Sequence, residues 1–216
     1  ITTDRPGIQT SFLYSADTSK TRVYSLLNSG SFARASVIVD TLNAAMPRGW
    51  SVSENGSMAF SDNGKRLFFG TSVKPVREPE DTLLAEERYK VDVWSWTDGQ
   101  IQPQQKRQLE RELKRTYQAV YLTDRNMMIQ LADTLMPDIR LNTRSDCGFA
   151  LGMSNFEYQR LSSWESRNYS DYYIVDLETG ERSLIFRKYP SQVQLSPGGN
   201  FIAAWSPDEM KWSLFS

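Results

Sequence analysis

The side chains on which many enzymes depend for proton transfer and metal binding are nearly missing from this sequence. It has 216 residues, no histidine and one cysteine, Cys147. A Ser-His-Asp triad, a Cys-His dyad and a His-ligated metal site all need histidine, so the chain alone cannot form them. A single cysteine forms neither an internal disulfide nor a thiolate zinc site. We therefore expect no catalysis by this chain and assign it no catalytic, cofactor-binding or metal-binding residue.

Two glycine-containing segments are candidates for a catalytic serine turn and for a phosphate-binding loop. Residues 152–156 read Gly-Met-Ser-Asn-Phe and lack the closing glycine of a nucleophile elbow, whose sharp turn needs small residues on both sides of the serine. Gly198 and Gly199 share one turn and do not open a helix, so they do not form a phosphate-binding loop. We interpret the first segment as a strand end and the second as a hairpin turn.

Charged residues offer two candidate binding features. Glu86 and Glu87 form a carboxylate pair of the kind that holds a substrate ammonium group. A basic run could instead meet an anion, and it comprises Lys106, Arg107, Arg111, Lys114 and Arg115. Glu110 and Glu112 are interleaved with this run, which is typical of a solvated helix face. Because exposed charges contribute little energy, we interpret both features as solvent-facing charge.

Tryptophans and turn acids are the remaining candidates. Five tryptophans could line a binding surface, but aromatic residues in strands more often fill the packing between sheets, which is the role we expect. They are Trp94, Trp96, Trp164, Trp205 and Trp212. Asp62, Asn63 and Asp124 could ligate calcium, but their spacing matches no calcium loop and turn formation explains them. Cys147 alternates with Phe149, which predicts a small buried side chain.

The composition is that of a globular protein. Hydrophobic residues make up 39% and charged residues 24% of the chain. The net charge of −1 lacks the basic excess of a dedicated nucleic-acid-binding protein. No apolar run approaches the roughly 20 residues that span a bilayer. The chain begins at Ile1 with no signal-like segment, and we expect it to be a processed or excised piece.

The elements that must position these residues are predicted to be β-hairpins. Alternating segments flank a turn at residues 61–65 that contains Asn-Gly, a strong short-range hairpin signal. The same order of alternating strand, Ser-x-x-Gly turn and apolar strand recurs at residues 193–205, with a degenerate copy at 139–152. A second type of hairpin is predicted at residues 118–131 and 172–186.

The two hairpin types together define a four-stranded antiparallel unit. Leu141 and Leu195 hold equivalent positions about 54 residues apart, close to the roughly 40–50 residues of a propeller blade. We therefore predict an all-β fold, a partial β-propeller built from four-stranded antiparallel blades. The predicted division of this one domain is a partial or irregular blade at 1–50, a blade with two insertions at 51–137, a blade at 138–190 and the start of a further blade at 191–216. Closed propellers typically have about 4–8 blades, so we expect the chain to be part of a larger ring.

The segments between and before these hairpins are predicted to be less regular. Residues 73–87 combine prolines with acidic residues and predict a solvated loop, and residues 103–115 predict a short surface helix. Val91–Trp96 alternates and predicts a strand. Near the N-terminus a hairpin at residues 11–27 and a strand at 35–39 precede Asp40 and Thr41, which are predicted to cap a short helix that ends at Pro47.

Several segments resemble the propeller of a known peptidase family. Residues 60–71 and 195–200 are similar to the Ser-Pro-Asp-Gly-Lys hairpin of TolB-like and prolyl oligopeptidase propellers. The segments that complete the similarity are Met46–Trp50, Lys90–Trp96, Gln102–Gln105, Lys114–Tyr121 and Gln130–Asp133. Over residues 46–205 the chain resembles the N-terminal propeller of the prolyl oligopeptidase-like (S9) serine peptidases of Bacteroides-type bacteria.

The resemblance implies a parent protein in which the propeller precedes an α/β-hydrolase domain that carries Ser, Asp and His. In that family the propeller restricts the access of peptides to an enclosed active site. The implied partners are the hydrolase domain of the same parent chain and peptide substrates, and the implied location is outside the cytoplasm, exported or periplasmic. The dipeptidyl peptidase branch uses a Glu-Glu pair after an Asp-Trp strand, whereas Glu86 and Glu87 precede Asp92 here, so that role is not transferred.

Other function classes stay open. A stand-alone TolB- or WD-type propeller that scaffolds a protein partner would have the same fold and would also lack chemistry. An α/β-hydrolase with a nucleophile elbow downstream would favour the peptidase, whereas a stop codon or more blades would favour the scaffold. A sugar-processing propeller enzyme would need acids that converge on a central channel, and it ranks below both. The open strand edges of a partial propeller also predict self-association at high concentration.

Overall fold

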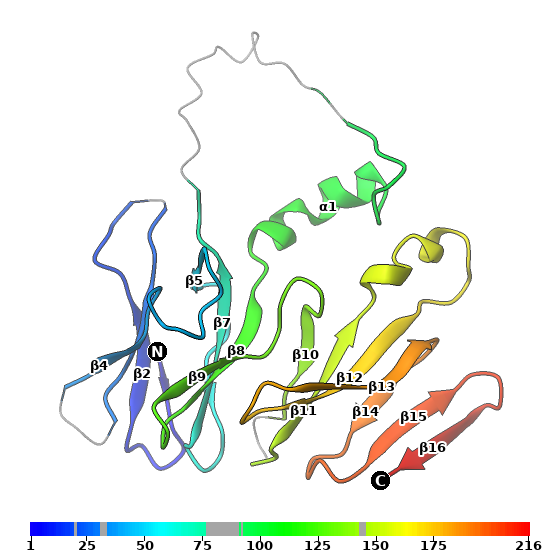
Figure 1. The fold of residues 1–216 in the computed structure, drawn as a ribbon. Helices are drawn as coiled ribbons and strands as arrows, with labels where there is room; N and C mark the ends of the chain where they lie inside the picture. Colours follow the sequence, from blue (N-terminus) through cyan, green and yellow to red (C-terminus); the bar gives the residue numbers. More distant parts are fainter. Residues whose placement is uncertain (20, 31–33, 77–90, 92, 143–145) are drawn as a thin grey trace.

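Four antiparallel sheets follow one another along the chain and stand side by side (Figure 1). The computed structural model describes residues 1–216 except residues 20, 31–33, 77–90, 92 and 143–145. The strands of the first sheet pair in the order β1-β2-β3-β4. They are β1 (Thr2–Thr3), β2 (Thr10–Tyr14), β3 (Ser25–Asn28) and β4 (Ser36–Val39).

The other three sheets repeat this sequential pairing. In the second sheet the order is β5-β7-β8-β9, with β6 paired to β7, and its strands are β5 (Trp50–Val52), β6 (Ala59–Phe60), β7 (Arg66–Val73), β8 (Tyr117–Leu122) and β9 (Met127–Gln130). The third sheet contains β10 (Asp138–Arg140), β11 (Phe149–Ser154), β12 (Ser170–Asp176) and β13 (Arg182–Tyr189). The last sheet contains three strands, β14 (Val193–Leu195), β15 (Ile202–Ser206) and β16 (Lys211–Phe215).

The predicted all-β class is confirmed. Antiparallel sheets, whose strands pair in chain order except at β6, form an open arrangement of the partial β-propeller type. The predicted surface helix is α1 (Gln102–Leu113), which has Pro103 in its first turn and no buried residue. Two short 3-10 turns, η1 (Phe156–Tyr158) and η2 (Leu161–Ser163), lie between β11 and β12.

The repeated Ser-x-x-Gly turns are closed by the same hydrogen bonds. The hydroxyl of Ser61 accepts a hydrogen bond from the Arg66 amide at 3.1 Å, and the hydroxyl of Ser196 accepts one from the Phe201 amide at 3.0 Å. The glycines that follow, Gly64 and Gly199, have φ angles of 70° and 76°, a backbone conformation that glycine adopts without strain. The serine and the glycine therefore fix each hairpin locally, and this explains why the pattern was visible in the sequence.

Apolar side chains fill the space between successive sheets in three clusters. In β7, Leu67 and Phe69 point toward the first sheet, whereas Phe68 points toward the third, because neighbouring side chains of a strand project to opposite faces. The second sheet is therefore buried on both faces. Between the third and last sheets the buried cluster is smaller and consists of Leu151, Tyr172, Val193 and Ala204.

Arginine side chains connect the second and third sheets, among them Arg66, Arg182 and Arg125, which pairs with Glu178 at 2.7 Å. Arg66 is 9% exposed, and its guanidinium donates to the carbonyl oxygens of Asp146 at 3.1 Å and Cys147 at 3.2 Å. Arg182 donates to the carboxylate of Asp133 at 2.8 Å and to the carbonyl oxygen of Leu131 at 2.9 Å. These bonds satisfy donors that would be costly to leave unpaired at a sheet interface.

The predicted strand at Val91–Trp96 is wrong. The described part of this segment is irregular, with Trp94 and Trp96 at 65% and 82% exposed, and Asp92 lies outside the described residues. Strand β7 already pairs with β5 and β6 on one side and with β8 on the other. The alternation of Val and Trp therefore finds no free strand edge beside β7. Of the predicted loop at residues 73–87, positions 77–87 also lie outside the described part.

The N-terminal region departs from its prediction at the short helix expected after Asp40. Asp40 and Thr41 do not cap a helix, because the side chains of Asp40 and Asn43 accept hydrogen bonds from the amides of Leu42 and Ala45 and close separate turns. Strands β1 to β4, in the region expected to be a partial or irregular blade, pair in one sheet whose register shifts between Leu26 and Leu27.

Candidate functional site

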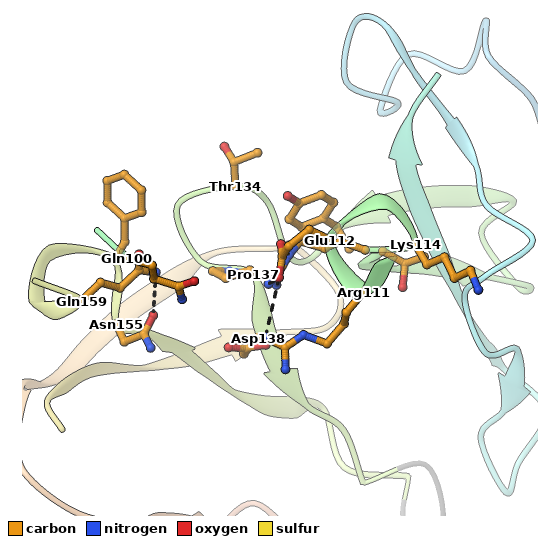
Figure 2. A pocket seen from close by; sticks show the side chains of 13 residues that line it. Gln100, Arg111, Glu112, Lys114, Thr134, Pro137, Asp138, Asn155 and Gln159 are labelled. Carbon is orange, nitrogen blue, oxygen red and sulfur yellow. Dashed lines mark hydrogen bonds and ion pairs between the residues drawn. The ribbon is translucent and has the colours of Figure 1, made fainter. Parts of the chain in front are cut away.

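A hollow lies between α1 and the third sheet, and it is the largest of three that adjoin there (Figure 2). It has a volume of about 710 Å³. Its wall is formed by the C-terminal part of α1, the start of β8, the loop before β10 and the turn η1. The polar side chains of this wall include Gln100, Arg111, Glu112, Arg115, Asn155 and Gln159.

The charges on the helix side of this hollow are paired with each other. The Arg115 guanidinium donates two hydrogen bonds to the Glu112 carboxylate, at 2.5 and 2.6 Å, and Arg111 lies 3.7 Å from the same carboxylate. The hydrogen bond from Arg115 lowers the pKa of Glu112 below its usual value, so Glu112 stays ionised at neutral pH. A charged ligand would have to compete with this internal pair.

The opposite side of the hollow is lined by carboxamides. Gln159 donates to the side-chain oxygen of Asn155 at 3.3 Å, and Gln100 lies beside them (Figure 2). Two smaller hollows, of about 390 and 270 Å³, adjoin the first, since Gln100 and Gln159 line all three and Gln108 lines both smaller ones. We call this continuous surface, defined by Gln100, Gln108, Asn155 and Gln159, the amide groove.

The predicted basic run lies on and just after α1, but it does not form an open anion site. Arg111, Lys114 and Arg115 line the largest hollow, and the first and last of these contact Glu112. Lys106 and Arg107 are exposed on the helix. The prediction of a solvated helix face is thus consistent with the exposure of the run. Glu86 and Glu87 lie outside the described residues.

The five tryptophans expected to fill the packing between sheets do not do so, and that prediction is wrong. Trp94, Trp96 and Trp164 are 65%, 82% and 88% exposed and lie outside the strands. Trp205 and Trp212 are cross-strand partners in the last sheet, with ring centroids 5.6 Å apart. Neither belongs to the cluster between the third and last sheets.

Trp205 and Trp212 lie on a face of the last sheet that no other sheet covers in the part of the chain that the structure describes. Ala203 pairs with Leu214 and Trp205 pairs with Trp212, and both pairs alternate with the buried Ala204. Trp212 is 51% and Leu214 is 68% exposed. We call the surface made by Ala203, Trp205, Trp212 and Leu214 the outer face. The second sheet buries the corresponding face, with Phe68 and Val120, against the third.

The remaining candidates differ in their contacts. Asn63 accepts hydrogen bonds from Ser61 and from the Lys65 amide within its turn, as predicted, whereas Asp62 forms an ion pair at 3.2 Å with Arg5, 57 residues away in the sequence. Among the described residues no group of three or more His, Cys, Asp or Glu could hold a metal ion. Residues 149–154 form β11, which confirms a strand end at Ser154. Cys147, expected to be buried, is only half-buried.

The amide groove was not found from the sequence. Gln100 and Gln108 belong to a glutamine-rich segment around α1, whereas Asn155 and Gln159 come from η1 and its flanks, which pack nearby only in the folded chain. The density of glutamine at residues 100–108 was a signal, but nothing in the sequence connected it to residues 155–159.

Comparisons with known proteins identify no family. No family model matches the chain, and no curated protein matches it. Among solved structures, hydrazine synthase of Kuenenia stuttgartiensis is similar with a TM-score of 0.34 and 11% sequence identity. The alignment covers 99% of this chain and 56% of that chain, so this chain spans little more than half of that structure. A likeness at this level carries no argument about function. Within the described residues, no helix has the length and apolar character needed to cross a membrane.

Proposed function

We propose that this chain is a non-catalytic propeller portion of a larger protein, and that its outer face packs against a further sheet or domain. The observation that carries the proposal is the exposure of Trp212 and Leu214 on a face whose equivalents in the preceding sheets are buried. Contiguous apolar surface of this kind usually marks an interaction site. Burial of the two exposed side chains would contribute roughly 25 cal/mol for each Å² removed from water.

We further propose that the larger protein is an exported or periplasmic prolyl oligopeptidase-like serine peptidase. The similarity of residues 46–205 to propellers of that family supports this assignment, together with the propeller-type arrangement of the sheets. In this proposal the chain limits the access of peptides to the active site of an α/β-hydrolase domain of the same parent chain. It supplies walls and docking surface, and the hydrolase domain supplies the nucleophile and base.

A stand-alone TolB- or WD-type scaffold is the second candidate function. The outer face also favours it, because a protein partner would cover the same apolar surface that a further sheet covers in the first proposal. The two candidates differ in the domain encoded downstream of this chain in the parent gene. A downstream α/β-hydrolase supports the peptidase portion, and its absence supports the scaffold.

The proposal is tested by asking whether the chain alone performs acyl-transfer chemistry. The purified chain is incubated with a fluorophosphonate probe and with chromogenic proline-containing peptides, beside an authentic serine peptidase as positive control. We expect neither labelling nor turnover, since the chain has no histidine to activate a serine. Stoichiometric labelling that Ser154→Ala abolishes would contradict the proposal.

The gating role is tested on the parent protein. Cleavage of a short peptide and of a folded protein substrate is compared in the intact parent and in a parent with residues 1–216 deleted. Gating predicts that the deletion removes the preference for the short peptide. An unchanged preference, with the hydrolase still folded and active, would contradict gating and leave the docking role to the outer face.

A further inference from the structure

We infer that the amide groove binds a neutral oligosaccharide, with hydroxyl groups on its carboxamides and a sugar ring on an exposed aromatic side chain. This inference does not depend on the peptidase proposal, because the groove lies on α1 and η1, away from the outer face of the last sheet.

Carboxamides suit a ligand rich in hydroxyl groups. Each side-chain amide has two donor hydrogens and one acceptor oxygen, and a sugar hydroxyl likewise both donates and accepts. Gln100, Gln108 and Gln159 are half-buried, so their stems are restrained while the groove gives access to their polar ends. The Gln159 to Asn155 hydrogen bond, at 3.3 Å, orders two of the amides before a ligand arrives.

The charge of the groove argues against an ionic ligand. Glu112 binds Arg115 through two short hydrogen bonds and lies 3.7 Å from Arg111, and the other two charged residues of the largest hollow, Lys114 and Asp138, have opposite signs. An anion would draw these arginines away from Glu112, and a cation would compete with both of them for the carboxylate. A neutral polar ligand leaves the pair intact, which makes it the ligand class that costs least here.

Aromatic side chains at the margin of the groove supply flat apolar surfaces. The Arg160 guanidinium lies 5.4 Å from the ring centroid of Trp96, and Arg160 directly follows Gln159. Trp96 remains 82% exposed, and Phe156, which lines the largest hollow, is 60% exposed. The C–H face of a pyranose ring packs on such a ring, whereas a peptide main chain offers no flat apolar face.

The shape of the groove favours several sugar units over one. Its three adjoining hollows, of about 710, 390 and 270 Å³, are joined through Gln100 and Gln159. Clefts that bind small molecules typically have volumes of about 300–1,000 Å³, so the larger two of these hollows could each hold a small ligand. Because the three hollows adjoin, a ligand of several linked units could extend from one to the next.

The test is isothermal titration of the chain with cellohexaose, maltohexaose and chitohexaose. We expect saturable binding of at least one of them, and we expect Gln159→Ala and Trp96→Ala each to weaken that binding about tenfold, the effect of losing roughly 1.4 kcal/mol of binding free energy. Gln194→Ala and Trp212→Ala replace the same residue types on the last sheet and should leave binding unchanged. Because Trp96 is largely exposed, its replacement should not unfold the chain, and a thermal melt checks this.

Three outcomes would overturn the inference. The first is that none of the three hexasaccharides binds at millimolar concentration. The second is that binding occurs but is unaffected by both groove variants, or is weakened equally by the control variants. The third is that a neutral Gly-Ala-Pro peptide binds in the groove and the sugars do not, which would assign the groove to peptides. Each outcome leaves the fluorophosphonate result unaffected, so the two proposals fail separately.

Discussion

Leu151 and Leu214 compare a sheet face that is buried with one that is exposed. Leu151, on β11, is 1% exposed because the last sheet packs against it, whereas Leu214, on β16, is 68% exposed because no sheet in the structure faces it. Both residues lie in strands of antiparallel sheets. The sequence of a strand therefore shows which apolar side chains could be buried. Whether each one is buried depends on the presence of a neighbouring sheet.

The largest expected effect compares these two leucines directly. Leu151→Ala should lower the free energy of unfolding by about 2–5 kcal/mol, because it removes buried methyl groups and leaves a cavity. Leu214→Ala should change it by less than about 0.5 kcal/mol in the dilute chain. Urea unfolding of both variants measures the difference. Equal losses would mean that the outer face is already covered in solution.

The same comparison of buried and exposed side chains can be made for two arginines, Arg66 and Arg5. Arg66→Met should cost about 1–3 kcal/mol, since it leaves the carbonyl oxygens of Asp146 and Cys147 without their donor at the interface of two sheets. Arg5→Met is the control, because Arg5 forms an ion pair with Asp62 but its side chain is 75% exposed, and the expected loss is below about 1 kcal/mol. The midpoints of denaturant unfolding measure both losses of stability, provided that the dependence of the unfolding free energy on denaturant concentration is the same in each variant. A larger loss for Arg5 would refute the assigned role of Arg66.

A smaller effect is expected on association. The outer face and the β16 edge should make the chain associate with itself as its concentration rises. Replacing Trp212 and Leu214 by lysine should shift this association to higher concentration, because charge is costly to bury. The matched control replaces Leu109 and Leu113, exposed leucines of α1, by lysine. Sedimentation velocity distinguishes the variants, and a wild-type chain that stays monomeric throughout would count against the prediction.

The smallest effect concerns pH. Burial tends to raise the pKa of Asp133, but hydrogen bonds from the Met136 amide and the Arg182 guanidinium outweigh it and lower that pKa. A carboxyl whose folded-state pKa is depressed stabilises the fold fully above its ordinary pKa of about 3.9 and loses that contribution as the pH falls through the folded-state value. Asp133→Asn should therefore make stability less dependent on pH in acid. Identical pH profiles for both proteins would show that the Arg182 contact contributes nothing measurable.

Sequence reasoning succeeded where the determinants were local. The hairpins at Ser61 and Ser196 depend on a serine and a glycine within a few residues, so their pattern predicted the turns. Sequence reasoning failed where the structure depends on contacts between residues that are far apart in the sequence. Val91–Trp96 has strand propensity but finds no edge beside β7, and the amides of Gln100 and Gln159 meet only after folding.

The central claim is that the outer face is a docking surface in the working protein. Hydroxyl-radical footprinting of Trp212 tests it most directly, when the purified 216-residue chain is compared with the protein isolated from its own cells and Trp96 serves as the exposed reference. We expect oxidation of Trp212 to be several-fold lower in the cellular protein, with oxidation of Trp96 unchanged. Equal oxidation of Trp212 in both samples would contradict the claim.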